Sequence, residues 1–211
     1  MVSRVSYRPF DEDDLKPIAS IVSETWHKDA PSPEFSRLEG AIDLAHMLSI
    51  STFSQVALID GAPSGIVLAR STRRRTPVSM RWQKVEEAYY LQMEEADPDA
   101  TARYGKTASA MDRVNDDLLR RSGFSGSGEV TLLVVGSSAR GLGIGSVLLD
   151  AAVEYLGSQG SDRAFLYTDS DCSWPFYERC GLKRAGEHRA ARDERQWLPK
   201  SMFLYALDLT A

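Results

Sequence analysis

The chain has 211 residues and a formal net charge of −5, from 25 Lys and Arg against 30 Asp and Glu. Hydrophobic residues make up 43% and charged residues 26% of the sequence, which is typical of a globular protein and excludes a disordered or fibrous chain. An acidic chain is a poor general binder of nucleic acid, because neutralising phosphates needs a basic surface. No segment approaches the ~18 apolar residues of a membrane span, and the N-terminus shows no signal-peptide pattern. We therefore expect a cytoplasmic protein without nucleic-acid or membrane partners.

The first 70 residues predict a strand, two amphipathic helices and a hairpin. Apolar residues alternate in the strand and recur at helical spacing in the helices. The dipeptide Asp60-Gly61 between two apolar runs is a strong hairpin signal. The expected elements are a strand over 2–10, helices over 15–26 and 35–48, and a hairpin over 55–70.

A helical segment with a different composition follows, at about 72–128. Asp97 followed by Pro98 is the pattern of a capping residue before the first position of a new helix. Gly123 is a suitable stop for that helix. We interpret residues 1–211 as a single domain and 72–128 as a helical insertion in it.

The last third of the chain alternates strands and helices. A β-branched run indicates a well-buried strand at Glu129–Val135. The following helix, 142–156, is expected to bury Ile144, Val147, Leu148, Ala151 and Tyr155. Later elements are strands over 163–168, 182–188 and 202–209 and a short helix over 174–180. Together the elements predict an α/β (mixed α+β) domain.

The loop Arg140–Gly145 lies between that strand and that helix. Its glycines permit close backbone approach to a ligand, and the first N–H groups of a helix bind anions. Acids are usual in a first helical turn, yet none occurs between Glu129 and Asp150. The pattern favours an external anion at this helix start, although a tight turn without a ligand is the alternative.

Three phosphate motifs compete for this loop. A P-loop is excluded because its lysine is missing. A dinucleotide fingerprint has Ser146 instead of its third glycine, and Asp169 could serve as its ribose carboxylate. The motif R/Q-x-x-G-x-G/A is met in full by Arg140, Gly143 and Gly145.

On this motif the sequence resembles the GNAT superfamily of N-acetyltransferases. The strand Glu129–Val135 precedes the motif as in that family, and the segment Trp174–Leu182 is similar to the family's "FYEKxGF" segment. The resemblance covers Glu129–Leu182 and implies a central, mostly antiparallel mixed sheet, splayed between strands 4 and 5 and flanked by helices. It also implies acetyl-CoA as the co-substrate. No metal is expected, because His27, His46 and His188 are far apart and form no metal-ligand spacing.

The resemblance further implies a set of cofactor-binding residues. The strand residues would pair with the pantetheine amides, and the loop would hold the pyrophosphate. Ser170 stands where many members carry a pantetheine-binding Asn, and its hydroxyl can make one such contact but not the pair that an amide makes. The set is Leu133, Val134, Val135, Arg140, Gly141, Leu142, Gly143, Ile144, Gly145, Ser146 and Ser170.

Two catalytic residues follow from the same resemblance. Tyr177 matches the family tyrosine that donates a proton to the leaving sulfur, and Glu129 matches a glutamate that takes the proton of the amine. Packing beside Phe176 is the alternative for Tyr177, and an exposed strand start is the alternative for Glu129. Asp169 and Asp171 are alternative carboxylates.

We therefore predict an N-acetyltransferase that passes the acetyl group to an amine of a small molecule or peptide by direct attack in a ternary complex. The two cysteines, Cys172 and Cys180, are expected to be packing thiols. The alternatives are a non-catalytic acyl-CoA-binding module and an NAD(P)-binding oxidoreductase. A homodimer is expected only by analogy with the family.

Overall fold

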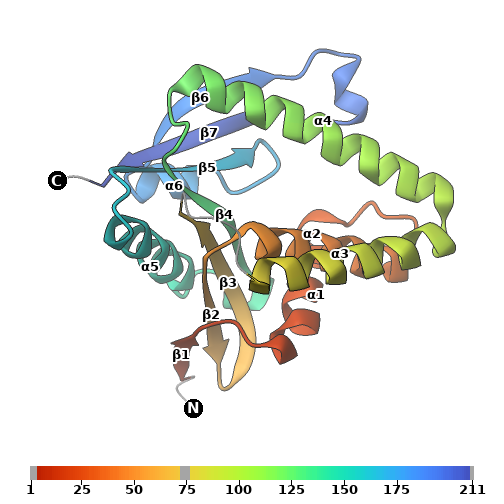
Figure 1. The fold of residues 1–211 in the computed structure, drawn as a ribbon, viewed down its shortest axis with the longest axis horizontal. Coiled ribbons are helices and arrows are strands. Elements are labelled where there is room, and N and C mark those ends of the chain that lie inside the picture. Colours follow the sequence, from red (N-terminus) through yellow and green to blue (C-terminus); the bar gives the residue numbers. More distant parts are fainter. Residues whose placement is uncertain (1–3, 72–76, 210–211) are drawn as a thin grey trace.

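A computed structural model of the chain describes residues 4–71 and 77–209. Within them the chain forms a seven-stranded sheet with helices on both faces (Figure 1). The strands are β1 (Val5–Arg8), β2 (Phe53–Ile59), β3 (Ala62–Arg70), β4 (Gly128–Val135), β5 (Arg163–Asp169), β6 (Lys183–Arg189) and β7 (Ser201–Asp208). The α-helices are α1 (Leu15–Trp26), α2 (Pro33–Ile50), α3 (Pro77–Ala96), α4 (Pro98–Ser122), α5 (Ile144–Ser158) and α6 (Pro175–Arg179). The predicted mixed α+β class is confirmed.

The sheet divides between β4 and β5. Its order is β1-β2-β3-β4-β5-β7-β6, and β4 and β5 run parallel whereas all other described neighbours are antiparallel. The two strands share only the register pairs Gly128–Ala164 and Glu129–Phe165. We call the end of this shared register the fork. The fork confirms the predicted splayed sheet.

Local sequence signals explain several element ends. Asp60 and Gly61 both have positive φ, 51° and 87°, as the predicted two-residue hairpin requires. The Asp97 side chain accepts the N–H of Ala100 and so caps α4, which begins at the predicted proline. Gly123 ends α4 in the left-handed conformation, with φ of 74°.

Helices cover both faces of the sheet. Helix α5 packs on one face against residues of β3, β4 and β5, while α1 and α2 pack on the other face of the β2–β4 half. The predicted inner face of α5 is partly wrong, because Val147 is 44% exposed. The buried positions form a stripe on the opposite side of the helix from Val147. They are Ile144, Leu148, Leu149, Ala152 and Leu156.

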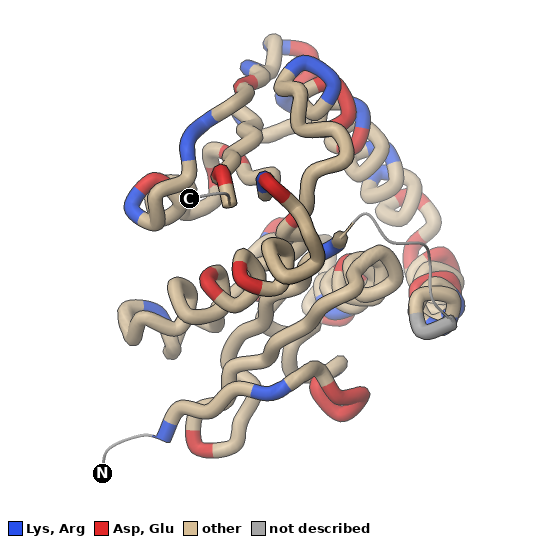
Figure 2. The backbone as a smooth tube through the Cα atoms, turned by 60° about the vertical axis from the view of Figure 1, so that its left-hand side comes forward, with Lys and Arg blue, Asp and Glu red and all other residues tan. Residues whose placement is uncertain are grey.

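The segment between β3 and β4 forms the long helices α3 and α4, as predicted, although its start at 72–76 lies outside the described residues. Helix α3 lies along α2, whereas α4 diverges from it and crosses to β6 and β7 (Figure 1). Leu118 of α4 is buried beside Leu204 of β7. Acidic and basic residues are interspersed along α4 (Figure 2). Among the described helices none is both long and apolar enough to cross a bilayer.

Candidate active site

The start of α5 has the geometry of an anion site. Gly141 and Gly143 adopt φ values of 81° and 77°, which only glycine reaches without strain. Gly143 caps the helix without a side-chain hydrogen bond, and the first turn contains no acid. In the described part of the chain, the N–H groups of Ile144 and Gly145 have no hydrogen-bond partner. The helix dipole adds partial positive charge there.

The rest of the loop is exposed around this helix start. Arg140 is exposed, and its Nε donates to the carbonyl of Val135 at 3.3 Å. Leu142 is 59% exposed. Ser146 differs, because its N–H donates to Gly143 at 3.2 Å and its hydroxyl lies 4.0 Å from the Cys180 sulfur. The loop residues therefore form one exposed surface around the first turn of α5, next to the end of β4.

The strand residues Leu133–Val135 lie on the free edge of β4. They pair with Gly65–Val67 of β3, so their other edge faces β5, from which β4 has separated after Glu129. The register slips at Thr131, which is left unpaired in a β-bulge. The Thr131 hydroxyl lies 2.7 Å from that of Ser51, which holds the bulge against the end of α2. Backbone groups along this edge are the ones the resemblance assigns to the pantetheine.

Tyr177 lies on the short helix α6, beside the start of α5. Its ring packs between Phe176 and Tyr205, with centroid distances of 5.3 and 6.0 Å. The Phe176 ring lies 3.4 Å from the position a Cβ of Gly145 would occupy, so α6 contacts the first turn of α5. Burial, and then the neighbouring Cys172 and other acidic groups, raise the pKa of Tyr177. The hydroxyl therefore stays protonated at neutral pH, as a proton donor must.

Glu129 is a buried carboxylate at the fork rather than an exposed strand start. Its side chain is 9% exposed and forms an ion pair with Arg70 of β3, its cross-strand neighbour. Burial raises the pKa of Glu129, and the Arg70 charge opposes part of that rise. Burial, and then the charges of Glu129 and Asp116, raise the pKa of Tyr167 on β5. The sequence alone did not indicate that Arg70, Tyr167 and Asp116 belong to this region. Only the strand register could have revealed Arg70 as the partner of Glu129.

Ser170 and Asp169 are engaged in the turn after β5. The Ser170 hydroxyl accepts the N–H of Ser201 at 3.2 Å and donates to Asp171 at 3.3 Å. The Asp169 carboxylate accepts the N–H groups of Asp171 and Cys172. Both side chains therefore hold the turn that leads to Tyr177, and the pantetheine contact of Ser170 stays a prediction.

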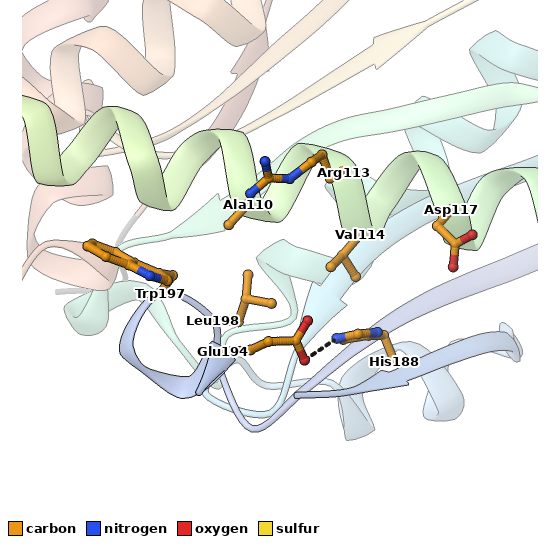
Figure 3. A pocket seen from close by; sticks show the side chains of 8 residues that line it. All are labelled: Ala110, Arg113, Val114, Asp117, His188, Glu194, Trp197 and Leu198. Carbon is orange, nitrogen blue, oxygen red and sulfur yellow. Dashed lines mark ion pairs between the residues drawn. The ribbon is translucent and has the colours of Figure 1, made fainter. Parts of the chain in front are cut away.

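A separate hollow of about 210 Å³ lies between α4 and the segment that joins β6 to β7 (Figure 3). The Nε2 atom of His188 lies 3.3 Å from the Glu194 carboxylate on the side opposite α4, and Trp197 and Leu198 also line the hollow. Neither the start of α5 nor Tyr177 reaches it. The hollow is thus a different place from the candidate active site.

Comparisons with known proteins agree with this geometry. The family model for the acetyltransferase (GNAT) family matches residues 18–182. No curated protein sequence matches the chain.

Solved structures are similar in fold. Aminoglycoside 6′-acetyltransferase type Ii is 18% identical with a TM-score of 0.58, and 98% of each chain is covered. PH1933 from Pyrococcus horikoshii OT3 is 12% identical with a TM-score of 0.61, over 97% of this chain and 98% of that one. The ribosomal-protein-S18-alanine N-acetyltransferase from Escherichia coli is 11% identical with a TM-score of 0.55, over 99% and 96%. Because the family model spans most of the sequence, the chain belongs to the GNAT family of acetyltransferases, which use acetyl-CoA as acyl donor.

Proposed function

We propose that this protein transfers the acetyl group of acetyl-CoA to an amine of a small molecule or peptide by direct attack in a ternary complex. The observation that carries the proposal is the arrangement around the fork. The unpaired edge of β4, the start of α5 with its free N–H groups and the hydroxyl-bearing Tyr177 lie next to one another. This arrangement supplies an anion site, free backbone groups and a proton donor in one place.

The donor would lie along the separated strands. Its pyrophosphate would accept hydrogen bonds from N–H groups of the loop Arg140–Ser146. Its pantetheine amides would pair with the free backbone groups of Leu133–Val135. One N–H of that edge would hold the oxyanion formed on the thioester carbonyl. A donor of this kind contributes ~3 kcal/mol to lowering the barrier in other acyl-transfer enzymes.

The transfer needs one proton donor and one proton acceptor. The amine nitrogen bonds to the thioester carbon, the carbon–sulfur bond breaks, and its electron pair goes to sulfur. Tyr177 gives sulfur a proton, and Glu129 takes the surplus proton of the nitrogen, directly or through water.

An acetylated cysteine intermediate is not part of the proposal. Cys172 and Cys180 are free, partly exposed cysteines, and both lie outside β4. Burial raises the pKa of Cys172 to about 11, so its thiol is protonated at neutral pH. The nucleophile of such a step is a thiolate, and this environment disfavours it.

The proposed acceptor class is supported by the family and by two of the three neighbours named above. Their names describe an aminoglycoside and an alanine of ribosomal protein S18 as acceptors of those proteins. For this chain we propose an amine of either kind. Acceptors should be screened as four groups: antibiotics, polyamines, amino acids and peptides.

The test is release of free thiol from acetyl-CoA in the presence of each amine group. We expect Tyr177→Phe to lower kcat about a hundredfold, because general acid catalysis contributes 10²–10⁴-fold, and to change acetyl-CoA binding little. Tyr90→Phe is the matched control, since Tyr90 is 39% exposed on α3, and it should leave kcat unchanged. Full activity of Tyr177→Phe would remove Tyr177 from its role. Thermal protection by CoA without thiol release for any amine would favour a binding module.

A further inference from the structure

Arg70 and Glu129 form the one ion pair at the fork among the described residues, and their contact is built into the sheet. Arg70 is the last residue of β3 and stands directly opposite Glu129 in the β3–β4 register. Glu129 is in turn the last residue of β4 that pairs with β5. The carboxylate is therefore held where the two strands separate.

The two partners differ strongly in exposure. The Glu129 side chain is 9% exposed, whereas that of Arg70 is 45% exposed. A buried carboxylate without a nearby cation is protonated more readily, because burial disfavours its charged form. A protonated Glu129 could not accept a proton from an amine.

The other charged or titratable groups around Glu129 do not supply that cation. Tyr167 of β5 lies near it, and neither Tyr167 nor Asp116 of α4, which acts on Tyr167, carries a positive charge. The nearest cation among the described neighbours is Arg70.

We propose that Arg70 is a positioning residue for acetyl transfer: it holds Glu129 at the fork in its ionised form, ready to take the proton of the attacking amine. The proposal rests on the proposed function, in which Glu129 is the base. In this proposal Arg70 acts through Glu129 and not directly on acetyl-CoA or the amine. Its effect is on the charge and the placement of Glu129.

The test combines a rate profile with a direct titration of Glu129. Arg70→Gln removes the charge, and Arg70→Lys keeps it. In Arg70→Gln we expect the acid limb of kcat/KM to move up by about one pH unit, because a nearby opposite charge lowers a carboxyl pKa by 1–3 units. Below that limb the variant should be about tenfold slower than the wild type, and at high pH the two should converge. Arg70→Lys should keep the wild-type limb.

The titration uses ¹³C-labelled glutamate and NMR, with the Glu129 carboxyl signal assigned by its loss in Glu129→Gln. Its midpoint should rise in Arg70→Gln by the same amount as the acid limb. Arg121→Gln is the control, because Arg121 pairs with Asp117 in an exposed ion pair on α4, and it should shift neither readout.

Several outcomes would overturn the proposal. One is an unchanged Glu129 midpoint in Arg70→Gln. Another is an equal loss of rate at every pH in Arg70→Gln and Arg70→Lys, which marks a merely structural role. Full activity of Glu129→Gln would also overturn the proposal. If the wild type acetylates no amine, the proposed function fails, and the NMR midpoints alone decide whether Arg70 sets the charge of Glu129.

Discussion

Gly143 stands just before the first residue of α5, with φ of 77° and nothing within 4 Å of the position a Cβ would take. The open space matters because the neighbouring N–H groups lack partners in the described structure. A side chain here would meet no protein atom, but it would stand where the pyrophosphate is proposed to approach the helix start. Under the proposed function, the glycine would serve both the backbone conformation and the access of the ligand.

We predict that Gly143→Ala lowers the free energy of unfolding by about 1 kcal/mol through left-handed strain. It should also raise the dissociation constant for CoA by about tenfold, or ~1.4 kcal/mol. Gly157→Ala in the same helix is the control, because Gly157 has no positive φ and equally open space. It should gain up to ~1 kcal/mol of stability and bind CoA normally. Titration calorimetry measures the CoA affinity, and urea unfolding measures the stability of each variant. Equal CoA affinity in the two variants would argue against the anion site.

At the scale of elements, a buried charge network joins α1, α2 and α4. His27, at the end of α1, lies 3.2 Å from Glu39 and 2.8 Å from Asp43 of α2. The hydroxyl of Tyr104 on α4 donates to the same Asp43. Burial acts to lower the pKa of His27, but its two carboxylate partners prevail and raise it to about 9. The imidazole is therefore charged at neutral pH and fixes the turn between α1 and α2.

This network makes stability depend on pH. The pKa of His27 is raised to about 9 in the folded state, from about 6.5 when unfolded. Its contribution, on the order of 3 kcal/mol, is present below about pH 6.5 and is lost as pH rises through about 9. In urea unfolding, the stability gap between wild type and His27→Gln should narrow over that range. His46→Gln is the comparison variant: pairing with Glu86 also raises the pKa of His46, but its side chain is 47% exposed, so its gap should narrow less. A gap for His27→Gln that stays constant with pH would contradict this prediction.

At the scale of the whole molecule, the helical pair α3 and α4 connects the two halves that the fork separates. Helix α3 packs on α2 beside the β1–β4 half, and α4 packs on β6 and β7. The sequence predicted this segment and its break at Asp97-Pro98, because capping and proline signals are local. It did not predict that the two helices diverge, because their apolar stripes do not name their partners. The interpretation of 72–128 as an insertion in a single domain stays a prediction.

In the candidate site, too, features formed by consecutive residues could be predicted, whereas contacts between distant residues could not. The loop Arg140–Gly145 could be recognised from spacing alone, since its chemistry depends on consecutive residues. The Arg70–Glu129 pair could not, because 59 residues separate its members and only strand register brings them together. Similarly, the sequence could not show that the Ser170 hydroxyl is bonded to the backbone of β7. The error at Val147 arose because helical spacing leaves open which side of an apolar helix meets the sheet.

The measurement that tests the account most directly is the initial rate of thiol release, with acetyl-CoA varied at several fixed concentrations of an accepted amine. Direct attack in a ternary complex requires both substrates to be bound before any product leaves. The account therefore predicts double-reciprocal lines that intersect. Parallel lines, together with an acetylated enzyme after incubation with acetyl-CoA alone, would contradict it.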